Sequence, residues 1–201
     1  MSYNPEIHKR RSIRLKGYDY SRAGLYFITI CVQNKGCLFG TIANHEMVLN
    51  DAGKMIGKWY SELENKFPDI KCHEMVVMPN HFHCVVENVG VGADLRVCPD
   101  PGENIGPGEP ILGEQNPPIL GEHIGSPLHR VVQWFKTMTT NEYIRGVKNA
   151  GWKPFDGKLW QRNYYEHIIR NQQSYEIISD YILNNPSKWE DDKLYIQMIK
   201  P

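Results

Sequence analysis

The sequence has no closely paired cysteines and no hydrophobic run long enough to cross a membrane. Its five cysteines are an odd number, and none of them forms a Cys-x-x-Cys pair. This pattern disfavours a disulfide framework. No apolar run approaches the ~20 residues of a membrane span, and residues 1–14 lack the apolar stretch of a secretion signal. We therefore expect a cytoplasmic protein with no membrane partner.

The sequence also lacks a net charge, because 23 Lys and Arg residues balance 23 Asp and Glu residues. The balance is uneven along the chain, since residues 90–126 hold six acids and a single base, Arg96. The remaining residues hold 22 bases and 17 acids, which gives them a net charge of +5. A moderately basic folded part permits binding to nucleic acid.

Residues 90–126 lack aromatic side chains, and they hold 8 of the 17 glycines and 6 of the 13 prolines. Such a composition cannot build a packed core, so we interpret the stretch as a flexible insertion between core elements. The chain length of 201 residues suits one domain with a long insertion. We expect a single domain over residues 1–201.

Hydrophobic patterning outside this insertion predicts alternating strands and helices. Strands are expected over 25–33, 74–78, 82–87 and 159–169, with a hairpin over 38–42 and 46–49. Helices are expected from 51 to 67, from 127 to near 146, and from 171 to near 185. This order predicts an α+β fold of the ferredoxin-like type, an antiparallel sheet with helices on one face, plus an added C-terminal helix.

Two short patterns bring together side chains that suit chemistry on phosphate. His81 and His83 are two residues apart on an expected strand, so both imidazoles point to one side and can chelate a metal ion. Tyr181 and Asn185 are four residues apart at the end of an expected helix and share one face. A tyrosine oxygen can attack phosphorus, and an asparagine oxygen can bind Mg²⁺ or Mn²⁺.

Three phrases, taken together and in order, resemble the REP-associated tyrosine transposases, which are single-tyrosine transposases of the His-hydrophobe-His (HUH) class. They are VVMPNHFHCVV over 76–86, LWQRNYYEHIIR over 159–170 and DYILNNPSK over 180–188. The expected strand YFITIC over 26–31 also resembles the family's first strand. The resemblance spans roughly residues 10–190 apart from the insertion, which departs from the family's compact pattern.

This resemblance implies a catalytic domain with the HUH endonuclease fold that cuts single-stranded or hairpin DNA. It places a divalent metal, Mg²⁺ or Mn²⁺, on His81 and His83, a third ligand on Asn185 and the nucleophile on Tyr181. His167 lies in the second phrase and is a candidate supporting residue. The implied reaction forms a 5′-phosphotyrosine and a free 3′-hydroxyl, which a second DNA end can reverse. A monomer and a homodimer both stay open.

Other interpretations compete with this one. Tyr164 and Tyr165 are rival nucleophiles on the strand expected around Trp160. The chain can also be a domesticated DNA-hairpin-binding protein that does not cut. A third interpretation is a zinc-stabilised domain, whose candidate ligands are Cys72, His73, His81, His83 and Cys84.

The N-terminal stretch is a basic arm that either is solvated or contacts DNA phosphates. Its candidate phosphate-binding residues are Lys9, Arg10, Arg11, Arg14 and Lys16.

Overall fold

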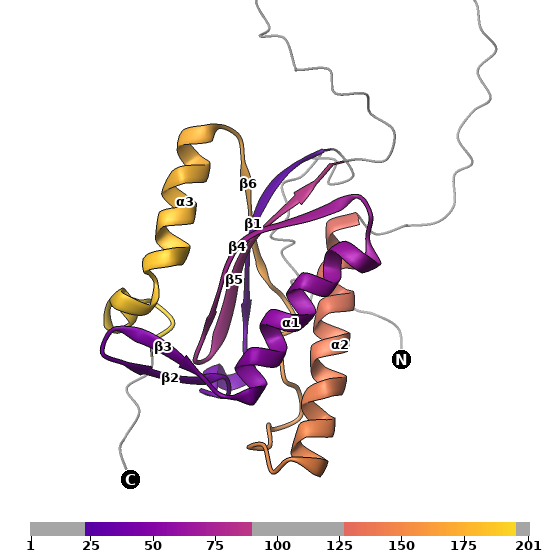
Figure 1. The fold of residues 1–201 in the computed structure, drawn as a ribbon, viewed down its shortest axis with the longest axis vertical. Coiled ribbons are helices and arrows are strands. Elements are labelled where there is room, and N and C mark those ends of the chain that lie inside the picture. Colours follow the sequence, from indigo (N-terminus) through magenta and orange to yellow (C-terminus); the bar gives the residue numbers. More distant parts are fainter. Residues whose placement is uncertain (1–22, 90–126, 196–201) are drawn as a thin grey trace, which may run out of the picture.

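The computed structural model describes residues 23–89 and 127–195 (Figure 1). The basic arm over 9–16 and the expected insertion over 90–126 lie outside the described residues. Both therefore stay predictions from the sequence.

Four strands form an antiparallel sheet in the order β4-β5-β1-β6. They are β1 (Gly24–Cys31), β4 (Ile70–Met78), β5 (His81–Asn88) and β6 (Tyr165–Ile169). The helices are α1 (Asp51–Lys66), α2 (Pro127–Asn149) and α3 (Gln172–Asn184), and a separate hairpin joins β2 (Gly40–Ala43) to β3 (Glu46–Leu49). Short 3₁₀ turns lie at η1 (Gln33–Lys35) and η2 (Pro186–Asp191). The predicted α+β class and ferredoxin-like strand order are confirmed.

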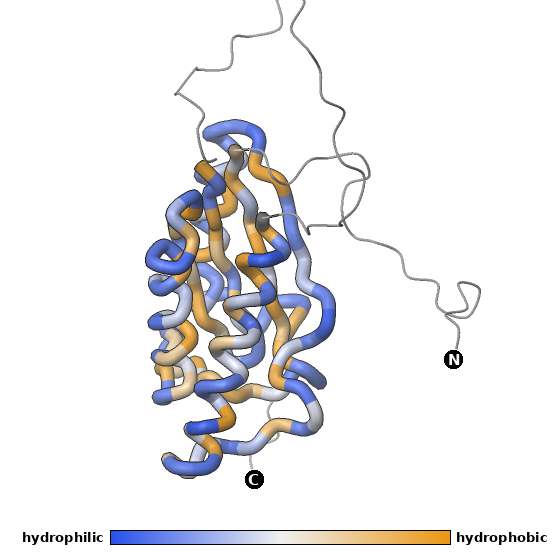
Figure 2. Tube along the Cα trace, turned by 90° about the vertical axis from the view of Figure 1, so that its right-hand side faces the viewer, coloured by the Kyte–Doolittle hydropathy of each residue, from blue (hydrophilic) through white to orange (hydrophobic). Residues whose placement is uncertain are grey.

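Helices α1 and α2 cover one face of the sheet, and α3 lies against the other (Figure 1). Strand β1 shows the alternation that this arrangement requires. Tyr26 and Ile28 join the large core beneath α1 and α2, whereas Phe27 joins a smaller cluster with Val85 and Ile182. Hydrophobic stretches accordingly run along the strands in the middle of the molecule (Figure 2). The face beneath α3 is the one that carries polar chemistry.

Asparagine caps fix the starts of two helices where the sequence predicts them. The Asn50 side chain accepts a hydrogen bond from the backbone N–H of Gly53 at 2.9 Å. The Asn171 side chain does the same for Ser174 at 2.8 Å. Each cap satisfies a backbone donor that the first turn of a helix leaves free.

The long strand expected over 159–169 is wrong, because only Tyr165–Ile169 pairs with β1. Trp160 makes an isolated bridge to Val32, and residues 161–164 between it and β6 belong to no strand. The ammonium of Lys136 on α2 donates to the carbonyl oxygens of Gln161 at 2.9 Å and Arg162 at 3.3 Å, which ties this segment to α2. Tyr164 therefore precedes the strand.

The end of α2 also differs from the prediction. The helix passes Gly146 and continues to Asn149. A Cβ atom at Gly146 would overlap the indole ring of Trp152, so this glycine admits a packed aromatic ring and does not end the helix.

Two expectations from composition are tested in the described part of the chain. Within residues 23–89 and 127–195, no helix is long and apolar enough to span a bilayer. Four cysteines there carry free thiols, which agrees with the absence of a disulfide framework; they are Cys31, Cys37, Cys72 and Cys84.

Candidate metal centre and nucleophile

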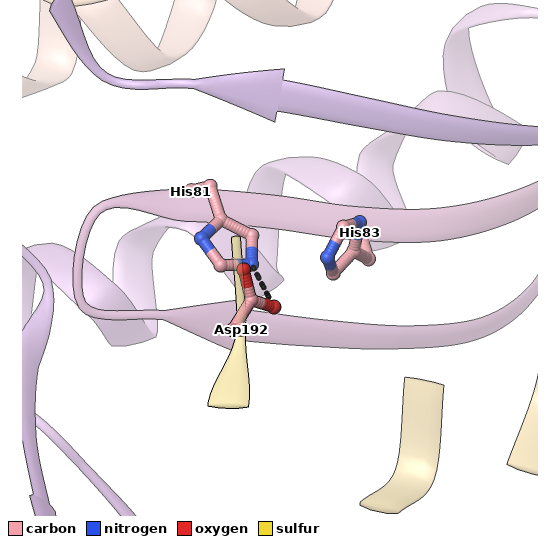
Figure 3. A group of neighbouring side chains, drawn as sticks. All are labelled: His81, His83 and Asp192. Atoms are coloured by element: carbon pink, nitrogen blue, oxygen red, sulfur yellow. Dashed lines mark ion pairs between the residues drawn. The ribbon is translucent and has the colours of Figure 1, made fainter. Parts of the chain in front are cut away.

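Strand β5 places the two imidazoles of His81 and His83 side by side on the face beneath α3 (Figure 3). Their ring centroids lie 4.4 Å apart, and the residues are 0% and 3% exposed. Phe82 and Cys84 point into the core under α1 and α2. The alternation expected for this strand is confirmed, and it gives two buried nitrogen ligands without distortion of the backbone.

A hydrogen-bond network fixes which nitrogen of His81 carries a proton. The Asn80 amide nitrogen donates to the carbonyl oxygen of Leu194 at 2.8 Å, so the Asn80 oxygen faces the His81 ring. That oxygen lies 2.8 Å from His81 Nδ1 and can only accept, so Nδ1 donates. His81 Nε2 is then an unprotonated nitrogen, and it is buried without a hydrogen-bond partner in the described structure. Orientation of a ligating histidine through its other nitrogen is typical of metal sites.

His83 is held in a comparable way from β1. The Thr29 hydroxyl lies 2.8 Å from His83 Nδ1, and the Phe27 ring stacks on the imidazole with centroids 5.3 Å apart. His83 Nε2 is directed towards α3, where it lies 3.3 Å from the Tyr181 hydroxyl oxygen. A contact across 98 residues of sequence thus joins the two chemical patterns seen in the sequence.

Burial keeps both histidines neutral. It lowers the pKa of His81 to about 3, and burial followed by the neighbouring His81 lowers the pKa of His83 to about 3. Neutral imidazole is the form that binds a metal ion, so the pair is ready for ligation at neutral pH.

Tyr181 is reachable from solvent, with 45% of its surface exposed, and its ring meets Phe27 edge-on at 6.0 Å. Burial of the hydroxyl end raises the pKa of Tyr181, and the negative charge of Asp192 raises it further. The hydroxyl is therefore protonated at neutral pH, and it loses its proton more easily when the charge of Asp192 is compensated.

Asn185 ends α3 and lies buried beside Tyr181, as its spacing from that residue predicts. Its amide nitrogen donates to Asp192 Oδ2 at 3.3 Å. This bond fixes the amide so that the Asn185 Oδ1 atom points away from Asp192, and Oδ1 is buried without a donor among the described residues. A buried acceptor without a donor is unusual and calls for a cation or a solvent donor.

Asp192, which follows η2, completes a group that the sequence does not reveal. Its carboxylate lies 4.0 Å from His81 Nε2, and the ligand atoms of His81, His83 and Asp192 all lie within 4.8 Å of one another (Figure 3). An unprotonated nitrogen and a carboxylate oxygen repel each other unless a cation lies between them. Two atoms bound ~2.0–2.2 Å from one ion lie at most about 4.4 Å apart, so this pair fits a metal ion.

The sequence conceals Asp192 because it ends an acidic run, Glu190-Asp191-Asp192, that reads as a solvated surface. Its side chain is only 5% exposed. The signal available was Trp189, since a tryptophan beside charges favours burial of its segment. Its ring packs 5.9 Å from the His81 ring.

The structure leaves other candidates outside the metal group. His167 lies on β6 opposite Phe27, is exposed and contributes no ligand atom. The ligand set found in the described part of the chain contains no cysteine, because Cys84 lies in the core and the Cys72 thiol donates to the Tyr60 carbonyl. A zinc site built on these cysteines has no support.

Comparisons with known proteins found one relative at high identity. No family model matches this chain. A Haemophilus influenzae protein described as uncharacterized is 40% identical over 205 residues, which cover 96% of this chain and 97% of that protein.

Two solved structures are also similar to this chain. One is a REP-associated tyrosine transposase bound to a REP hairpin, with TM-score 0.47 and 20% identity over 94% of this chain and 74% of that one. Another is a candidate transposase from Deinococcus radiodurans, with TM-score 0.42 and 11% identity over 85% of this chain and 95% of that one.

Proposed function

This chain belongs to the family of the Haemophilus influenzae protein, and we propose that it is a metal-dependent HUH transposase that cuts and rejoins single-stranded DNA near hairpins. Resemblance of three sequence phrases to the REP-associated tyrosine transposases supports this function. The observation that carries it is the position of Tyr181, a partly exposed side chain whose hydroxyl oxygen lies 3.3 Å from Nε2 of the buried His83.

Tyr181 is the proposed nucleophile. Its hydroxyl gives up its proton to solvent as its oxygen attacks a backbone phosphorus in line with the 3′-oxygen. The new O–P bond forms as the P–O3′ bond breaks, and the departing 3′-oxygen takes up one proton from solvent, so protons balance. The products are a 5′-phosphotyrosine and a free 3′-hydroxyl. Since the phosphodiester energy is kept in the covalent link, a second 3′-hydroxyl can reverse the step and rejoin DNA.

His81, His83, Asn185 and Asp192 would hold the metal, which is Mg²⁺ or Mn²⁺. Two imidazoles and an amide bring no charge, so Asp192 supplies the anionic oxygen that these hard cations prefer. When bound, the metal supplies Lewis-acid stabilisation of charge on the phosphate. Thr29 and Asn80 orient the two histidines from behind.

The basic residues of the N-terminal arm would contact DNA phosphates. This role for Lys9, Arg10, Arg11, Arg14 and Lys16 rests on charge alone.

Covalent capture of DNA tests the nucleophile. Wild-type protein incubated with a single-stranded hairpin DNA and Mn²⁺ should form an adduct that survives denaturing electrophoresis. Tyr181→Phe keeps the ring against Phe27 and removes only the oxygen, so it should fold, still bind the DNA and form no adduct. A tyrosine with a purely structural role would lose at most one hydrogen bond, worth about 1 kcal/mol.

Tyr165 offers a matched control for this experiment. It is 53% exposed, and its ring also meets Phe27 edge-on, at 6.3 Å. Tyr165→Phe should form the adduct normally. An adduct that persists in Tyr181→Phe and vanishes in Tyr165→Phe would move the nucleophile to β6. Absence of any adduct from wild-type protein that binds the hairpin would favour the non-catalytic interpretation.

A further inference from the structure

We infer that Tyr165 and His167 form a stacking surface for unpaired bases of the DNA strand, next to the phosphate that Tyr181 attacks. The inference rests on the proposed function for the identity of the DNA and of the attacked phosphate. It assigns a role to two residues of the second sequence phrase that the metal centre does not use. Such residues would set how the strand lies across the site.

Tyr165 stands close to the reaction centre without belonging to it. In the sheet it pairs with Thr29, whose hydroxyl contacts His83. The Phe27 ring is shared, because Tyr165 and Tyr181 both meet it edge-on, at 6.3 and 6.0 Å. An exposed aromatic ring two strands away from the histidines, with β1 between, is therefore held in a fixed relation to the proposed nucleophile.

The surface around Tyr165 is left open by the described elements. Helix α3 packs mainly over β4 and β5, which lie towards the opposite edge of the sheet from β6. Strand β6 is an edge strand, with β1 as its single neighbour in the described sheet. Tyr165 is 53% exposed although a tyrosine ring gains stability when it is covered, so this ring is available to a planar partner.

His167 extends the same surface. It is two residues further along β6, so it points to the same face as Tyr165 and pairs with Phe27. Its side chain is exposed, and the two Cα positions lie about 6.6 Å apart along the strand. Two exposed rings at alternate positions of a strand are the arrangement by which sheet-based RNA-binding domains stack successive bases.

Charge around β6 favours a nucleic-acid strand over a peptide or a lipid. Exposed arginines lie before and after the strand, at Arg162 and Arg170. The carboxylate of Glu166 belongs to the opposite face, since alternation turns it away from Tyr165. A surface that binds single-stranded nucleic acid combines aromatic rings, on which bases stack, with positively charged side chains that contact the phosphates.

Base-dependent binding tests this surface separately from cleavage. We would use full-length Tyr181→Phe protein in EDTA, with a DNA hairpin carrying a short single-stranded tail. 2-Aminopurine is placed at each tail position in turn, and its quenching on binding locates the base that meets Tyr165. Adding Tyr165→Ala should abolish quenching there and weaken binding about 5- to 100-fold, whereas Tyr165→Trp should retain both.

An abasic tail supplies the decisive control. If Tyr165 stacks on a base, removal of that base should abolish the penalty of Tyr165→Ala, because the two changes delete one interaction. Leu183→Ala, at an exposed position on α3, should change neither quenching nor affinity. His167→Ala should reduce quenching and affinity at the tail position next to the one that meets Tyr165, and His167→Phe should restore both.

Two results would overturn the surface. One is unchanged affinity in Tyr165→Ala, and the other is an equal penalty on tails with and without the base. Adduct formation by wild-type protein with Mn²⁺ reports on the proposed function independently. If an adduct forms but Tyr165→Ala has no effect, the proposed nuclease function stands and the stacking surface is contradicted. If the Tyr165 effect depends on the base but no adduct forms, the stacking surface stands and the nuclease function is contradicted.

Discussion

At the scale of single residues, the site depends on atoms that can accept hydrogen bonds but have no donor near them in the described structure. His81 Nε2 and Asn185 Oδ1 are both buried in this condition. Asp192 lies 4.0 Å from the first of these atoms and accepts a hydrogen bond from the amide nitrogen of Asn185. Leaving buried acceptors without donors costs free energy of about 1–3 kcal/mol each. The same atoms become favourable ligands once a cation is present, so we expect metal binding to stabilise the fold.

Asp192→Asn removes the charge from this group with little change in size. We expect Mn²⁺ to bind more weakly, on the order of 10-fold, because charge sets the affinity of oxygen ligands for hard cations. The pKa of Tyr181 should fall in the metal-free protein, since the Asp192 charge raises it. Quenching of the fluorescence of Trp189, whose ring lies 5.9 Å from that of His81, measures the affinity for Mn²⁺. Ultraviolet titration of the phenol measures the pKa of Tyr181.

The neighbouring Asp191→Asn makes the same change of charge at an exposed position. It should leave both measurements as in wild type. If the two variants weaken Mn²⁺ binding equally, Asp192 acts only through the general field of the acidic run and is no ligand.

At the scale of elements, β5 makes the fold sensitive to acid. In the unfolded chain, histidine takes up a proton as the pH falls below about 6.5, whereas His81 and His83 stay neutral until about pH 3. The unfolded state thus binds more protons over this interval, and stability falls as the pH falls through it. Each histidine contributes about 2 kcal/mol to this effect, so the free energy of unfolding, measured with urea in EDTA, should fall by about 4 kcal/mol between pH 7 and pH 5.

Replacement of both histidines by glutamine should flatten this dependence below pH 6.5. His45→Gln is the control, because His45 is exposed in the turn between β2 and β3. Equal acid sensitivity in the double variant and in wild type would contradict the assignment of the effect to β5.

Elements differ in how far the sequence predicts them, for physical reasons. Alternation identifies β5, and the caps Asn50 and Asn171 mark two helix starts, because these signals are local. The length of β6 cannot be predicted from local sequence alone, since the carbonyl groups just before the strand bond to the distant Lys136 ammonium on α2. Asp192 is also beyond local patterns, because its burial depends on the docking of η2 beside β5.

At the scale of the whole molecule, the described elements form a complete ferredoxin-like sheet without residues 90–126. We propose that this stretch is an insertion within a single domain. Replacement of residues 93–123 by a short Gly/Ser linker should keep the circular dichroism spectrum and leave the melting temperature within a few degrees. The reason is that glycine, proline and acidic residues contribute little to a core. Loss of cooperative unfolding in this variant would contradict the proposal.

The two sides of the sheet have hydrophobic clusters of unequal size. Tyr181, the proposed nucleophile, lies over the smaller cluster, which is built around Phe27, Val85, Ile169 and Ile182. Helices that bury little apolar surface open more often than the strands beneath them. Native-state hydrogen exchange should therefore show amides of α3 exchanging well before those of β5. Tyr181 would then leave and rejoin the histidines by local opening of one helix, while the rest of the fold stays closed.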